Sequence, residues 1–259
     1  MRTLPLADNG EVSASEVIRD LHELADPERA QHSARYFKTG RGEYGEGDTF
    51  IGVRVPQVRE VARIHRSLPP AEIQELISSE EHEVRLCALI IAVNRYTRSR
   101  SEIEKAELFS LYLSNVRAGY VNNWDLIDTS APTFGGFLLS DENRRELLLE
   151  LAQSASLWER RLSLMFTFAF IRVNEFDDAL AMAEYLLGDS HDLIHKASGW
   201  MLREIGNRDV GVLRTFLHSH AAVMPRTELR YAIEKLDEDE RQYWLNSQLT
   251  AQLSEQAEG

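Results

Sequence analysis

The stretch HEVRLCALIIAVNRY (82–96) places charged residues in its first turn and then continues as an almost unbroken apolar run. Three later stretches share this design: WERRLSLMFTFAFIR (158–172), HKASGWMLREIGNR (195–208) and RTELRYAIEKL (226–236). Apolar residues spaced three and four apart, with good helix formers between them, predict an α-helix in each. The recurrence of one design indicates internal repeats.

The repeated stretches recur at a nearly constant interval. The Glu-x-Arg pattern at Glu83 recurs at Glu159, 76 residues later, which is two steps of 38. The basic residues Arg160, Lys196 and Arg230 follow one another at intervals of 36 and 34 residues. A period in the thirties with two helices per unit is typical of stacked αα-hairpins of the HEAT type. An irregular helical bundle is the alternative that the period alone leaves open.

The rest of the chain reads as helical too. No segment shows sustained period-two alternation, and hairpin turn dipeptides are absent between apolar runs. We therefore expect an all-α fold, a solenoid of HEAT-like αα-hairpin repeats, forming a single domain over residues 1–259. The predicted helices cover 15–25, 27–38, 56–67, 70–78, 82–97, 102–114, 123–131, 142–153, 157–172, 176–187, 191–206, 208–219, 226–236 and 239–247.

Composition narrows the class of protein. The chain has 259 residues, a single cysteine and a formal charge of -13, from 42 acidic and 29 basic side chains. One cysteine excludes an intramolecular disulfide framework and a cysteine-based zinc site. The N-terminus has no secretory pattern, and the longest apolar run (86–93) is far too short to span a bilayer. These features predict a soluble cytoplasmic protein with no membrane partner.

The acidic charge lies mainly at the two ends. Residues 1–28 carry seven acidic and two basic side chains, and residues 236–259 carry six and one. We expect the acidic segments 1–28 and 248–259 to be peripheral to the repeats. Net charge alone argues against a nucleic-acid partner, because phosphates repel an acidic protein, but the region between the ends is nearly neutral.

One helix of the central region is strongly basic. The stretch RVPQVREVARIHR (54–66) has four arginines against one glutamate, whereas PAEIQELISSEEHE (70–83) has five glutamates. In a solenoid, the two helices of a pair face opposite sides, so the sides would differ in sign. The pattern fits either a basic surface for a duplex or solvated faces with local salt bridges.

The loop at 39–50 contains a literal G-x-G-x-x-G, GRGEYG (40–45). In a dinucleotide site this motif follows a strand and opens a helix, but here it follows a predicted helix. Glu43, Glu46 and Asp48 would also repel a pyrophosphate. We therefore expect no nucleotide cofactor and interpret the loop as a flexible connection.

The stretch VNNWDLIDTSAP (121–132) is the most informative for chemistry. Trp124 and Asp128 are four residues apart, hence on one face of a helix, while Asp125 suits a first-turn acid. Pro132 cannot donate to the carbonyl of Asp128, so the helix should kink or end there. A core tryptophan with a solvated aspartate is the alternative when this stretch is taken alone.

Two later repeats add matching side chains. LWERR (157–161) offers Arg160 and Arg161 at a helix start, and Trp158 is assigned to the core. Trp200 and Arg203 are three residues apart on a similar face of their helix. Gly199, in the same helix interior, signals a close approach of backbone, either to another helix or to a ligand.

Here the sequence resembles the AlkD-type DNA alkylation repair proteins, a family of HEAT-like DNA glycosylases. The resemblance covers roughly residues 30–245. It is carried by the order and spacing of ARYFK (34–38), FIGVRVPQVRE (50–60), NWDLIDTSAP (123–132), LWERR (157–161) and KASGWMLRE (196–204). It implies a curved stack of hairpins with duplex DNA on the concave side. The glycine-rich loop and the acidic ends depart from the shorter family members.

The resemblance also implies the roles of individual residues. Asp128 becomes the catalytic carboxylate, and Trp124 and Trp200 the aromatic walls beside the sugar of the damaged nucleotide. The residues implied to contact DNA are Arg161, Arg203, Tyr36 and the adjacent Arg160. The implied reaction is the release of cationic N3- and N7-alkylated purines, such as 3-methyladenine and 7-methylguanine, in base excision repair, without a base-flipping pocket.

The chemistry agrees with this set of side chains. An alkylated purine is already cationic and leaves without a general acid, so one carboxylate can stabilise the charge that develops on the sugar. No lysine accompanies Asp128, which predicts a monofunctional glycosylase. We expect no metal and no cofactor, and a monomer that associates with the bacterial nucleoid when it acts. A non-catalytic HEAT-like module that binds DNA or protein is the alternative.

Overall fold

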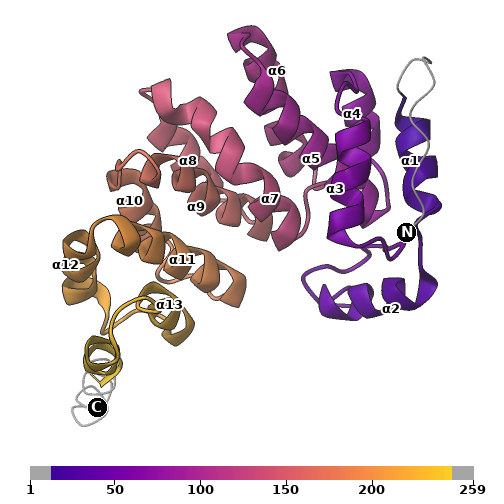
Figure 1. Cartoon of the computed structure of the whole chain (residues 1–259). Helices are drawn as coiled ribbons and strands as arrows, with labels where there is room; N and C mark the ends of the chain where they lie inside the picture. The colour runs from indigo at the N-terminus through magenta and orange to yellow at the C-terminus, as the bar shows by residue number, and fades with distance from the viewer. Residues whose placement is uncertain (1–12, 247–259) are drawn as a thin grey trace. The chain divides into compact units, whose positions relative to one another are not determined.

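The computed structural model describes residues 13–246, and the fold in that range is all-α, as the sequence predicts. The one ladder contact between residues in this range is an isolated parallel bridge between Thr49 and Glu81. None of the helices in it is long and apolar enough to cross a membrane. The elements in Figure 1 are α1 (Ala14–His22), α2 (Pro27–Tyr36), α3 (Val55–Ile64), α4 (Pro70–Ile77), α5 (His82–Arg98), α6 (Glu102–Arg117), α7 (Trp124–Phe134), the 3-10 helix η1 (Gly135–Ser140), α8 (Arg144–Ala152), α9 (Leu157–Ile171), α10 (Asp177–Tyr185), α11 (Asp192–Arg208), α12 (Val210–His220) and α13 (Arg226–Ala232).

The predicted helices are confirmed with ends that differ by a few residues, and residues 238–246 are helical as predicted, residue 247 lying outside the described range. The sequence analysis did not predict η1. Its predicted helix end at residue 131, just before Pro132, is also wrong, since α7 continues to Phe134. Proline removes only one helical hydrogen bond. The fully buried side chains of Ala131 and Phe134 hold the following turn in the core.

The described chain divides into two compact units, residues 13–130 and residues 131–246. In the first unit α5 is the central helix and packs against α3 and α4, which α1 also contacts. Every residue of α5 from His82 to Ala92 is buried. The run HEVRLCALIIA thus forms a helix that other elements cover on all sides, as a helix without a polar face requires.

The first acidic segment is not peripheral, contrary to the sequence prediction. Ala14, Val17 and Leu21 of α1 are fully buried, because they lie three and four residues apart on one helix face. Asp26 is a cap that accepts hydrogen bonds from the first amides of α2. The remaining parts of the predicted peripheral segments, 1–12 and 248–259, lie outside the described residues.

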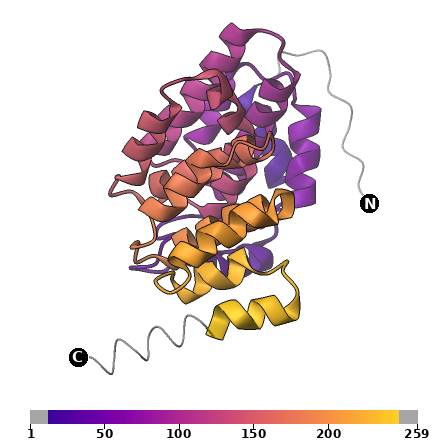
Figure 2. The ribbon, with the colours of Figure 1, turned by 90° about the vertical axis from the view of Figure 1, so that its left-hand side faces the viewer.

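In the second unit α9 packs against α8, α10 and α11, and α11 packs against α12 and α13. Figure 2 shows α11, α12 and α13 in orange and yellow. A Cβ atom on Gly199 of α11 would lie 2.5 Å from the carbonyl oxygen of Glu228 and 2.6 Å from Cβ of Tyr231, on α13. Helix packing therefore explains this glycine.

Equivalent side chains mark the repeat in α5, α9 and α11. The fourth residue of each helix is Arg85, Arg160 or His195, and each bonds back to the chain before its own helix. Both arginines donate to the carbonyls five and six residues earlier, at 2.8–3.0 Å. The repeat therefore aligns Arg85 with Arg160. The sequence pattern had aligned 83–85 with 159–161, which pairs Arg85 with Arg161, one residue further on.

Candidate active site

Trp124 and Asp128 lie one turn apart on α7, in the first unit. Trp124 begins the helix, and its backbone N–H donates a hydrogen bond of 2.9 Å to Oδ1 of the buried Asn123. Both side chains are partly exposed. Residues four apart share a helix face, so the carboxylate and the indole are available to one ligand.

The indole of Trp124 belongs to an aromatic group at the end of α2. Phe37 stacks on it with 5.5 Å between ring centroids, and Tyr36 meets it edge-on at 6.2 Å. Tyr36 is 59% exposed. The structure thus places Tyr36 beside Trp124. The sequence analysis had taken these residues from two separate motifs, Tyr36 as a DNA contact and Trp124 as a catalytic residue.

A buried tyrosine of α6 feels the charge of Asp128. Tyr112 is fully buried, and this burial is the main reason why the pKa of its phenol is raised; the hydrogen bond with Ser130 lowers that pKa, and the negative charge of Asp128, the smallest of the three effects, raises it. The carboxylate of Asp128 therefore affects a buried group of the first unit, although Asp128 itself is partly exposed to solvent. This is the environment of a carboxylate at the edge of a low-dielectric core.

A buried ion cluster that the sequence analysis missed supports the start of α7. The imidazole of His82 lies between two carboxylates, with Nδ1 2.7 Å from Asp48 and Nε2 2.8 Å from Asp125. Burial would lower the pKa of His82, but the two carboxylates outweigh it and raise the pKa to about 9. His82 is therefore an imidazolium at neutral pH.

The loop at 39–50 is not a flexible connection, contrary to the sequence prediction. Asp48 is buried, and its carboxylate accepts a second bond from Arg85 at 2.5 Å. Burial would raise the pKa of Asp48, but the bonds and charges of His82 and Arg85 outweigh it and lower the pKa. The buried carboxylate of Glu83, on α5, accepts hydrogen bonds from the backbone N–H groups of the three residues that follow the loop, Ile51, Gly52 and Val53. These anchors fix the loop to α5.

Trp200 lies on α11, in the second unit. Its Nε1 donates to Glu204 at 3.0 Å, and its ring lies 6.0 Å from that of Phe168 on α9. The residue is partly exposed. Trp200 thus presents part of an indole whose orientation is held by a bond to its own helix.

Arg203, one turn further along α11, is already ion-paired. Its guanidinium bonds to Glu234 and lies 3.5 Å from Glu204. The side chain is 19% exposed. A phosphate that binds here would therefore compete with Glu234 for the guanidinium.

The other two arginines predicted to contact DNA are held within the second unit. Arg161 is 4% exposed and donates to the carbonyl of Leu193 at 2.5 Å. Arg160 pairs with the carboxylate of Asp189 at 2.7 Å besides its two carbonyl bonds. Their position at a helix start reflects the repeat, and the prediction of an open phosphate contact is not supported for Arg161.

The arginines of the basic helix α3 and its flanks are exposed. They are Arg54, Arg59, Arg63 and Arg66. One of the four, Arg63, pairs with Glu60 at 2.6 Å. One of the predicted local salt bridges is therefore present, while a basic surface that binds a duplex stays a prediction.

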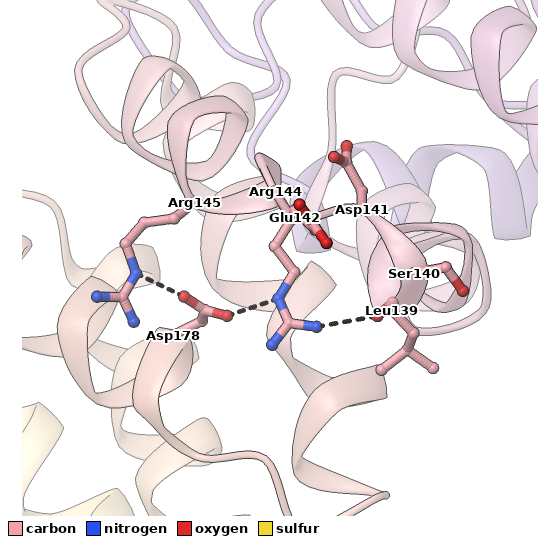
Figure 3. A pocket seen from close by; sticks show the side chains of 7 residues that line it. All are labelled: Leu139, Ser140, Asp141, Glu142, Arg144, Arg145 and Asp178. Atoms are coloured by element: carbon pink, nitrogen blue, oxygen red, sulfur yellow. Dashed lines mark hydrogen bonds and ion pairs between the residues drawn. The ribbon is translucent and has the colours of Figure 1, made fainter.

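A pocket of about 480 Å³ lies in the second unit (Figure 3), and none of the predicted site residues lines it. Asp178 sits between two arginines there, 2.7 Å from Nε of both Arg144 and Arg145. The guanidinium of Arg144 also lies 4.4 Å from the ring centroid of Phe170. This network ties α8 to α10.

Among the described residues, no three His, Cys, Asp or Glu side chains form a group that could hold a metal ion.

Comparison with known proteins gives the family. The family model described as DNA alkylation repair enzyme matches residues 17–236. A solved structure, the predicted DNA alkylation repair enzyme from Enterococcus faecalis, is similar with a TM-score of 0.64 and 17% identity, over 83% of this chain and 97% of that one. Among curated proteins, none matches the chain. The family match spans most of the sequence, and the chain belongs to the DNA alkylation repair enzyme family.

Proposed function

We propose that this protein is a DNA glycosylase that removes cationic N3- and N7-alkylated purines from duplex DNA. Family membership supports a role in alkylation repair with DNA as the substrate. The observation that carries the finer proposal is the pair Trp124 and Asp128 on one face of α7, beside the exposed Tyr36. A carboxylate next to aromatic faces suits a reaction whose transition state gathers positive charge on a sugar.

The leaving group explains why a single acid suffices. Alkylation at N3 or N7 leaves the purine positively charged, so it departs as a neutral base without proton transfer. Ordinary glycosidases need two carboxyl groups because their leaving group must be protonated. Here the C1′–N bond breaks, the sugar gains oxocarbenium character, and the carboxylate of Asp128 stabilises that charge and orients the water that attacks C1′.

The remaining residues receive supporting roles. Trp124 contributes an indole face to the sugar, and we assign Trp200, on α11, to an aromatic contact with the damaged DNA, as the resemblance implies. Arg203 is the phosphate contact, in exchange for Glu234. Arg160 and Arg161 are assigned to holding α9 and α11 in the second unit rather than to DNA. We expect the protein to act as a monomer in the cytoplasm, on the nucleoid.

The test is base release from methylated duplex DNA. We expect the protein to liberate 7-methylguanine and 3-methyladenine, and to leave neutral lesions such as hypoxanthine in place, because a neutral purine needs a general acid that this site does not supply. Chromatography of the released bases gives the result. Duplex binding without release of any base would favour the alternative, a non-catalytic HEAT-like binding module.

A further inference from the structure

His82 occupies a position that requires a doubly protonated ring. Its two ring nitrogens face carboxylate oxygens, Nδ1 toward Asp48 and Nε2 toward Asp125, at 2.7 and 2.8 Å. A neutral imidazole donates from one nitrogen only, so only the imidazolium satisfies both acceptors. The residue is 1% exposed, so water cannot replace either bond.

The charges around His82 balance. The charged groups that face it come from three elements: Asp48 from the loop before α3, Arg85 from α5 itself and Asp125 from α7. Arg85 bonds to the same carboxylate, that of Asp48, and to Oδ1 of Asn122 just before α7. Two cations and two anions thus form a neutral buried cluster. Loss of the His82 proton would leave a carboxylate without its donor, which is costly in a buried site.

Aromatic stacking connects the same ring to Trp124. The His82 ring stacks on Phe50 with 4.4 Å between centroids and lies 5.1 Å from Phe37. Phe37 in turn stacks on Trp124 at 5.5 Å. A cationic ring over aromatic faces gains electrostatic attraction beyond packing. His82 therefore reaches Trp124 by two routes, through Phe37 and through Asp125, the next residue in α7.

We infer that His82 is a positioning residue, which by remaining charged between Asp48 and Asp125 fixes the indole of Trp124 and, one turn on, the carboxylate of Asp128. This inference rests on the proposed function for its catalytic consequence. Its structural part, that the charge state of His82 sets the environment of Trp124, stands independently of any activity.

The first experiment follows the indole N–H resonance of Trp124 by NMR between pH 6 and 10. Comparison with W124F assigns the signal. In the wild type we expect a transition near pH 9, the pKa of His82. In D125N the transition should move to lower pH by about 1 to 3 pH units, because one of the charges that hold the proton is gone. It should vanish in H82Q.

A matched control exists in the same unit. His65, at the end of α3, pairs with Asp20 of α1 at 2.7 Å and is 4% exposed. H65Q removes an equally buried histidine–aspartate pair and should leave the Trp124 transition in place. A Trp124 signal that does not change with pH, or that titrates in H82Q as in the wild type, overturns the inference.

The second experiment separates positioning from DNA binding. Under single-turnover conditions H82Q should release 7-methylguanine about 10- to 100-fold more slowly than the wild type, since misplacement of a reacting group costs rate of this order. Its duplex Kd should change less than about twofold, because the interaction lost acts in the transition state. H65Q should change neither quantity. If the wild type itself releases no base, the proposed function fails, while the NMR result still decides the role of His82.

Discussion

At the scale of single residues, Arg203, the proposed phosphate contact, is already ion-paired in the free protein. The guanidinium bonds to Glu234 and lies near Glu204, the residue that also holds Nε1 of Trp200. An ion pair this close to solvent contributes little net free energy. A DNA phosphate brings the added gain of counterion release, so it can replace Glu234 at low salt. In the proposed complex, the arginine would exchange Glu234 for a phosphate.

Neutralising Glu234 should strengthen DNA binding. In E234Q the competitor for Arg203 is weakened, and we expect duplex affinity to rise about 1.4- to fivefold, the equivalent of the roughly 0.2–1 kcal/mol of an exposed pair. Fluorescence anisotropy at low salt measures it. E238Q, which disrupts the surface pair of Glu238 with Arg241, removes the same net charge and is the control. Equal tightening in both variants would mean that net charge, and not Arg203, controls affinity.

The sequence predicts some of these residues and not others for a physical reason. Trp124 and Asp128 lie within one helical turn, so their common face follows from spacing alone. The cluster of His82 with Asp48 and Asp125 joins three elements that are 34 and 43 residues apart. No local pattern encodes such pairing. For the same reason the arginine-rich helix start at 160–161 resembled a phosphate site, although tertiary contacts engage both side chains.

At the scale of elements, the contact between α11 and α13 depends on the missing side chain of Gly199. The backbone carbonyl of Glu228 and Cβ of Tyr231 occupy the space that a methyl group would need. The sequence indicated a close approach at this glycine, but only the structure distinguishes a helix from a ligand. The helix ranges themselves were predictable because apolar periodicity is local, whereas the alignment of the repeats depends on contacts that connect α5, α9 and α11 to preceding loops.

Substitution of Gly199 should therefore destabilise the second unit. G199A gains helix propensity but forces backbone apart, and we expect a net loss of about 1–3 kcal/mol in the free energy of unfolding. Gly188 is the matched control, since nothing lies within 4 Å of a Cβ atom built on it. G188A should change stability by less than about 0.5 kcal/mol. Urea denaturation of both variants gives the comparison, and equal stabilities would show that α11 and α13 separate at little cost.

At the scale of the whole molecule, the charge of -13 includes acids that are not on the surface. Glu83 and Glu228 are buried, and Glu228 is bonded through one oxygen to Ser198 while its Oε2 has no hydrogen-bond partner among the described residues. Burial raises the pKa of Glu228 to about 7, against a smaller opposing effect of Ser198. The carboxyl group is thus largely protonated in mildly acidic solution. Net charge from composition therefore overstates the charge that DNA would meet.

Glu228 predicts how stability changes with pH. Its pKa is higher in the folded than in the unfolded chain, so its contribution to stability is complete below about pH 4.5 and is lost as pH rises through about 7. The loss is on the order of 3 kcal/mol, from about 1.4 kcal/mol per unit of pKa difference. Chemical denaturation from pH 4.5 to 8 should show this decline in the wild type. In E228Q the decline should be smaller, and an unchanged slope would mean that Glu228 does not titrate in this range.

The most direct measurement of the central claim is the single-turnover rate of 7-methylguanine release by D128N. The carboxylate of Asp128 is proposed to stabilise the charge on the sugar, so D128N should release base at least about 100-fold more slowly than the wild type, with duplex affinity retained. D177N, which neutralises an exposed acid at the start of α10, should behave as the wild type. Release by D128N at the wild-type rate would contradict the account.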